Sequence, residues 1–113
     1  MSWSSTAAPL TGSIVLGDIN SGTTVGATTG FITGGSKTSG GGASVFTVNF
    51  ADIGTTSYMP IFTFESTSGT PNDDNDLRTP VIFNKTSSSF QVHIEEESAV
   101  VQAITMYVTL IRY

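Results

Sequence analysis

Apolar side chains in much of this chain recur at every second position, which is the spacing of a β-strand that buries one face. The pattern is clearest at Phe46, Val48 and Phe50, which alternate with polar residues, and it recurs in the segment from Phe90 to Ile94. No segment of ten or more residues places apolar side chains at helical spacing. We therefore expect an all-β fold, an antiparallel β-sandwich of about six strands.

The expected strands are separated by polar or glycine-containing segments. They cover Ser13 to Leu16, Val45 to Ala51, Tyr58 to Phe64, Thr79 to Asn84, Phe90 to Glu95 and Ala103 to Arg112. The last strand is apolar on nearly both faces, because Tyr107 and Ile111 lie on the side opposite Met106. Such a strand should lie centrally in its sheet or meet another subunit with one face, and we expect a homotrimer.

The stretch from Gly17 to Ala43 is dominated by Gly, Ser and Thr and holds few apolar side chains. We expect it to wrap the core as long loops, and we expect a second long connection from Ser66 to Asp76. Long connections in a compact β domain commonly carry function. The whole chain, residues 1–113, is expected to form one sandwich domain with residues 1–11 as an N-terminal arm.

Size and charge limit the possible functions. The 113 residues give room for one sheet-on-sheet core. Only 12% of them are charged and the formal net charge is −5, which disfavours nucleic acid as a partner. We expect no membrane insertion, since no apolar run approaches the roughly 20 residues of a spanning helix, and a soluble, complete chain, since no signal segment is recognisable. The absence of cysteine excludes disulfides and thiolate chemistry.

Groups suited to catalysis are few. His93 is the sole histidine, and its place on the polar side of an expected strand favours a solvated residue over a catalytic base. The carboxylates cluster in Asp73 to Asp76 and Glu95 to Glu97, consecutive runs that are typical of solvated turns. Calcium at Asn72 to Asp76 stays open as an alternative, although the spacing differs from that of calcium loops. We expect a protein that is not an enzyme and that uses no cofactor and no metal.

Several features follow one another in a recognisable order. They are Gly12-Ser13-Ile14, Gly17-Asp18, Val48-Asn49-Phe50-Ala51, the proline-bearing strand Tyr58-Met59-Pro60-Ile61, a polar loop ending in Asp76-Leu77-Arg78, then Ser89-Phe90-Gln91-Val92 and a long terminal strand. In this order the chain resembles the H-type lectins, small trimeric β-sandwich proteins that bind N-acetylgalactosamine and related sugars. The resemblance is strongest from Val45 to Tyr113.

The resemblance implies a surface glycan as ligand, with an N-acetylgalactosamine-like sugar as one candidate, bound between the subunits of a trimer. Arg78 falls where the family places an arginine that contacts the sugar, and its several donors suit adjacent sugar oxygens. The family's aromatic residue and histidine are replaced by Glu95-Glu96-Glu97-Ser98-Ala99, and Lys37 to Gly42 lacks its aspartate. The candidate ligand-binding residues are Arg78, Asp76, Ser39, Glu96 and Glu97.

Two alternatives stay open. Arg78 is either a ligand contact or a surface ion-pair partner of Asp76 or Glu65. The segment Gly12 to Asn20 also resembles parts of bacteriophage tail-fibre and virion proteins, so the alternative function is that of a non-enzymatic structural or decoration protein of a virion or tail fibre. Under either function we expect the protein to work outside a cell or on a virion surface.

Overall fold

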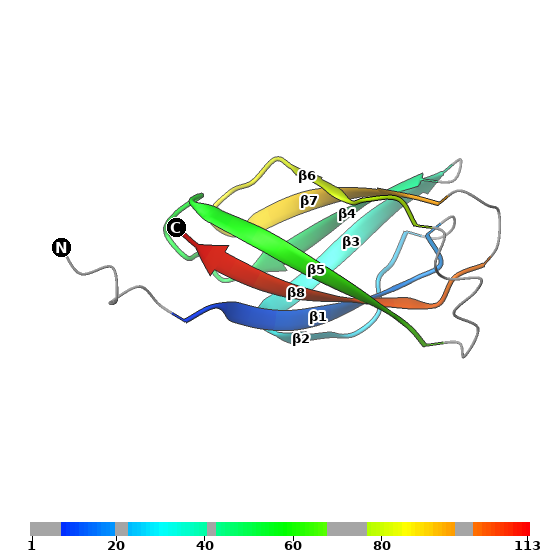
Figure 1. Cartoon of the computed structure of the whole chain (residues 1–113), viewed down its shortest axis with the longest axis horizontal. Coiled ribbons are helices and arrows are strands. Elements are labelled where there is room, and N and C mark those ends of the chain that lie inside the picture. Colours follow the sequence, from blue (N-terminus) through cyan, green and yellow to red (C-terminus); the bar gives the residue numbers. More distant parts are fainter. Residues whose placement is uncertain (1–7, 20–22, 41–42, 68–76, 97–100) are drawn as a thin grey trace.

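The computed structural model describes residues 8–19, 23–40, 43–67, 77–96 and 101–113, and shows two antiparallel four-stranded sheets packed face to face (Figure 1). The first sheet contains β2 (Thr28–Gly30), β1 (Leu10–Gly17), β8 (Ile104–Arg112) and β5 (Tyr58–Ser66), hydrogen-bonded in this order. The second contains β3 (Ile32–Gly40), β4 (Ala43–Phe50), β7 (Ser89–Glu95) and β6 (Val81–Phe83), also in this order. The all-β sandwich is confirmed, with eight strands in the described residues rather than about six.

The core lies between the two sheets and is built from the alternating residues. The apolar side chains whose spacing predicted β4 and β7 are all 5% exposed or less: Phe46, Val48, Phe50, Phe90, Val92 and Ile94. Ile14, Met106 and Leu110 of the first sheet belong to the same buried cluster. Burying one such side chain contributes about 1.5–3 kcal/mol, so this shared interior is the main source of stability.

Tyr58 fixes the start of β5 within this core. Its side chain is fully buried, and its ring packs edge-on against Phe50 with 5.8 Å between the centroids. The hydroxyl lies 2.9 Å from the carbonyl oxygen of Thr86 and 2.8 Å from that of Ser89. Burial raises the pKa of Tyr58 to about 12. The neutral phenol therefore ties the first sheet to the segment that enters β7.

The prediction of long loops from Gly17 to Ala43 is wrong, because β2 and β3 lie in this stretch. The sequence of β3 has hardly any apolar alternation, so the period of two that predicts a strand is missing. Close backbone packing takes its place. A Cβ atom at Gly35 would lie 2.6 Å from Thr47 O and 2.7 Å from Ile14 Cδ1. Gly35, one of the small residues that suggested a loop, is needed for this approach.

A single residue, Phe31, separates β2 from β3 and carries the chain from one sheet to the other. Gly30 has a φ of +66°, and a Cβ atom there would lie 2.1 Å from Thr11 O, so the crossing requires glycine. The N–H of Phe31 donates to that same oxygen, and its ring packs against Phe50. The chain therefore closes this side of the sandwich itself.

The opposite side is bounded by the edge strands β5 and β6, and we call it the open side. Pro60 lies in β5 and pairs with Leu110 of β8. An edge strand such as β5 tolerates a residue that has no backbone N–H. β8 lies between β1 and β5, which confirms the first of the two expectations for it, a central position in its sheet. Exposed apolar side chains of the two edge strands border the open side: Met59, Ile61, Val81 and Phe83.

The sheets contain a little more of the N-terminal region than expected. β1 begins at Leu10, so the last two residues of the expected arm 1–11 belong to the first sheet. Residues 1–7 lie outside the described part of the chain. In the part that is described, no helix has the length and apolar character that crossing a membrane requires.

Candidate functional site

Three of the five predicted binding residues are described, and they lie toward one end of the second sheet. Ser39 is near the end of β3, which pairs through β4 with the end of β7. Glu96 follows β7 and forms an isolated bridge with the residue before Arg78. Asp76 and Glu97 lie outside the described residues. The fold thus brings these three positions to one end, but their side chains meet different surroundings.

The Arg78 side chain is 60% exposed, and its Nε lies 3.8 Å from Glu95 Oε2. The backbone N–H of Arg78 also donates to the carbonyl oxygen of Glu95, at 2.8 Å. Glu65, one of the two ion-pair partners considered for Arg78, accepts a hydrogen bond from Tyr107 in the first sheet. An exposed ion pair typically contributes under about 1 kcal/mol to the free energy of unfolding, so this pair alone does not make Arg78 a structural residue. A ligand contact by Arg78 stays a prediction.

Ser39 and Glu96 take part in hydrogen bonds inside the end of the sandwich. Ser39 Oγ lies 2.9 Å from Ser44 Oγ, which bonds in turn to the carbonyl oxygen of Ile19. The side-chain amide of Gln102 donates to Glu96 Oε2 and accepts from the N–H of Ile19. We call Lys37, Ser44, Glu96 and Gln102, each 8% exposed or less, the buried polar cluster. Its hydrogen bonds join the two sheets, which gives these residues a structural role. Ligand binding by Ser39 or Glu96 stays a prediction.

Lys37 was expected in a loop, and the structure corrects this by placing it in β3 at 7% exposure. Its ammonium group donates to Leu16 O at 3.0 Å and to Asp18 O at 2.8 Å. Burial lowers the pKa of Lys37, and the charge of Asp18 partly opposes this effect. The lysine therefore fastens the end of β1 to β3 from within.

The histidine and the described carboxylates lie apart from one another, except at the end of β7. His93 Nε2 lies 3.9 Å from Glu95 Oε1, and the histidine side chain is 41% exposed on β7. Within the described ranges, no group of three or more His, Cys, Asp or Glu side chains could hold a metal ion. The calcium alternative at Asn72 to Asp76 lies outside those ranges.

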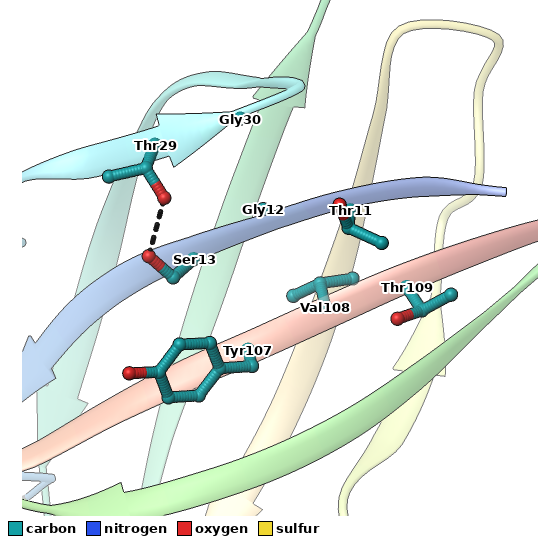
Figure 2. Close-up of a pocket in the computed structure, with 8 residues that line it drawn as sticks. All are labelled: Thr11, Gly12, Ser13, Thr29, Gly30, Tyr107, Val108 and Thr109. Carbon is teal, nitrogen blue, oxygen red and sulfur yellow. Dashed lines mark hydrogen bonds between the residues drawn. The ribbon is translucent and has the colours of Figure 1, made fainter.

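A groove of about 360 Å³ lies on the outer face of the first sheet, where the sequence placed no site (Figure 2). Residues from three adjacent strands line it: Thr11, Gly12, Ser13, Thr29, Gly30, Tyr107, Val108 and Thr109. We call it the hydroxyl groove. Its side chains form two rows across the sheet, Thr29-Ser13-Tyr107 and Thr11-Thr109, because these residues are paired in register. Directly paired residues place their Cβ atoms about 4.5–5.5 Å apart, so the hydroxyl groups are close neighbours.

Two hydrogen bonds organise the hydroxyl groove. Ser13 Oγ and Thr29 Oγ1 lie 2.7 Å apart, as the dashed line in Figure 2 shows. The hydroxyl of Tyr107 donates to Glu65 Oε1 on β5 at 2.6 Å. This bond, with the charge of Glu65, raises the pKa of Tyr107. Tyr107 as a whole is 44% exposed, so it is held at the groove with part of its surface available.

The sequence contained only a weak signal for this groove. Ser13 and Tyr107 are the outward-facing members of alternating strands, and an outward tyrosine was read as a subunit contact. They share a groove because β2, β1 and β8 are neighbours in the sheet, which brings residues near position 11 beside residues near position 109. Strand order cannot be read from alternation, so the site could not be assembled from the sequence.

Comparison of the chain with protein-family models, with curated proteins and with solved structures finds no match. Two surface regions carry chemistry from which a function can be inferred, the hydroxyl groove and the exposed Arg78–Glu95 pair.

Proposed function

We propose that this chain is a non-enzymatic carbohydrate-binding module, lectin-like in the sense of the H-type lectins, with the hydroxyl groove as its site. The observation that carries the proposal is the meeting of four hydroxyl side chains and an exposed tyrosine ring in one shallow groove. Sugars present C–H faces that pack on aromatic rings and hydroxyls that exchange hydrogen bonds with Ser and Thr. The volume lies within the range of small-ligand sites.

The proposal includes a homotrimer on the outside of a cell or virion. The support is the set of exposed apolar residues at the open side, because a lone domain gains nothing from exposing them. Ile61 is paired directly with Thr109 of the groove, so a subunit packed on β5 would border the bound sugar. Light scattering at micromolar concentration should give the mass of three chains, and a monomer would remove this part of the proposal.

Binding to a glycan array, with inhibition by free saccharide, tests the function. Ser13→Ala removes a hydroxyl from the groove and should weaken binding by about fivefold or more, since a net hydrogen bond contributes roughly 1 kcal/mol. Ser36→Ala makes the same change at an exposed position of β3 and should leave binding unchanged. Binding that no saccharide inhibits, or equal losses in the two variants, would contradict the proposal.

The runner-up is a structural or decoration protein of a virion that binds no sugar. The exposed apolar residues of the open side favour it equally, because they suit protein contact. It is distinguished by the same array, on which a structural protein gives no saccharide-inhibitable signal.

A further inference from the structure

Cationic side chains do not line the hydroxyl groove, and the structure describes all four Lys and Arg residues of the chain. Lys37 bonds to carbonyl oxygens inside the sandwich, Lys85 donates to the start of β5, and Arg78 pairs on the second sheet. Arg112 follows the groove along β8, and its guanidinium donates to Ala8 O at 3.2 Å. Carboxylate and sulfate groups are recognised chiefly through such cations. The residues that line the groove therefore offer no cation to a carboxylate or sulfate group.

A carboxylate stands beside the groove instead. Glu65 is exposed on β5 and accepts a hydrogen bond from the hydroxyl of Tyr107. A carboxylate has about four lone-pair sites, so Glu65 can still accept a hydrogen bond from a sugar hydroxyl. Because the proton of Tyr107 is directed to Glu65, the phenol oxygen presents lone pairs to other donors. Both groups therefore suit a ligand that donates hydrogen bonds.

We infer that the hydroxyl groove selects neutral sugars over sugars that carry a carboxylate or sulfate, and that Glu65 sets this selection. The inference rests on the proposed sugar-binding function and adds to it the class of glycan. A neutral hydroxyl donates to Glu65 and Tyr107, whereas an anionic group brings only acceptors and a charge of the same sign. The net charge of −5 adds a weaker, long-range repulsion.

The test uses the full chain on an array that carries neutral oligosaccharides, each beside its sulfated and its sialylated derivative. The wild-type protein should bind the neutral member of a pair at least tenfold more tightly. Glu65→Gln keeps a side-chain oxygen that can accept from Tyr107 but removes the charge, and it should reduce that ratio severalfold. Asp52→Asn is the matched control, because it removes one exposed charge and keeps an acceptor for its bond to Gly54. It should leave the ratio unchanged.

The outcomes separate this inference from the function on which it rests. Equal binding of neutral and acidic derivatives by the wild-type protein overturns the selection while leaving sugar binding intact. A neutral preference that Glu65→Gln does not alter, or that Asp52→Asn alters equally, overturns the role of Glu65. An array with no saccharide-inhibitable binding overturns the proposed function, and the inference falls with it. Equal melting temperatures of the two variants and the wild type show that all three are folded.

Discussion

Two regions of this molecule are rich in polar side chains, and they differ in where their hydrogen bonds go. In the buried polar cluster, Lys37 and Gln102 bond to backbone and side-chain groups between the sheets. In the hydroxyl groove, Ser13 and Thr29 bond to each other at the surface and border an exposed aromatic ring. The first region joins strands. The second combines polar groups with open space, which is what a ligand needs.

The comparison shows that residue type alone is a poor guide to function in a β-sandwich. Glu96 and Arg78 were predicted to bind ligand from their types and order, yet Glu96 is 8% exposed while the Arg78 side chain is 60% exposed. Burial raises the cost of an unsatisfied polar group, so interior polar residues must bond to their neighbours. Mutations should accordingly change stability in the first region and binding in the second.

The largest effect is expected for Lys37→Met in the buried polar cluster. The change keeps most of the unbranched side chain but removes the donor to Leu16 O and Asp18 O. We expect the free energy of unfolding to fall by about 3 kcal/mol, because each unsatisfied carbonyl costs roughly 1–3 kcal/mol and the loss of a buried charge offsets part of this. Urea denaturation measures it. Ser36→Ala, on the exposed side of β3, is the control, and a Lys37→Met variant as stable as the wild type would show that the interior bonds are dispensable.

The second prediction compares the buried Tyr58 with the exposed Tyr107. The pKa of Tyr58 is raised to about 12, above the ordinary value of 10, so the folded state keeps a proton that the unfolded chain loses. This contribution to stability is complete below pH 10 and is lost as the pH rises through 12, an effect of roughly 2–3 kcal/mol. Denaturation at a series of alkaline pH values measures the slope. Tyr58→Phe should flatten it strongly, and Tyr107→Phe should flatten it less, because the raised pKa of Tyr107 comes from a hydrogen bond and a charge at the exposed surface rather than from burial. Equal slopes in both variants would refute the assignment.

Tyr107→Leu should sharpen the contrast in the groove. The ring surface is lost while an apolar strand residue remains, so we expect saccharide affinity to fall at least tenfold, or about 1.4 kcal/mol. The free energy of unfolding should change by less than about 1 kcal/mol, because the side chain is 44% exposed. Thr38→Val, at an exposed position on β3, serves as the control for surface changes. A loss of stability in proportion to the loss of binding would mean that Tyr107 is structural.

The smallest effect on stability is expected for Arg78→Ala. Its ion pair with Glu95 is exposed, so the melting temperature should hardly change, in keeping with a contribution below about 1 kcal/mol. If the hydroxyl groove is the site, saccharide binding should be retained as well. Loss of binding in Arg78→Ala, with binding retained in Ser13→Ala, would move the site to the end of the second sheet, where the family resemblance placed it.

Much of the fold could be predicted from the alternation of apolar residues. β4, β7 and β8 have buried faces of Phe, Val, Ile, Leu and Met, and their strands and the central position of β8 follow from this pattern. β3 could not be predicted, because its inward positions include Gly35 and Lys37, which no hydrophobic pattern marks. Its strand is specified by the neighbours it packs on, and these are known only once the sheets are assembled.

The candidate site was harder to predict than the fold. The hydroxyl groove combines Ser13, Thr29 and Tyr107 from three strands, and only the pairing of β1 with both β2 and β8 brings them together. The buried position of Glu96 does follow from alternation, because it continues the series Phe90, Val92 and Ile94 by two residues, but its charge favoured a surface position. The sequence therefore indicated the polar positions along each strand, but it did not predict which of these positions lie together on one surface.

The place of β8 in the first sheet has a consequence for synthesis of the protein. β8 is the last of the eight described strands to emerge from the ribosome, yet β1 and β5 each pair with it along their length. The four strands of the second sheet all emerge earlier and can begin to pair with one another. Until β8 arrives, the apolar faces of β1 and β5 lack the strand that joins them, so the first sheet, and with it the sandwich, can be completed only after residue 112 has been synthesised.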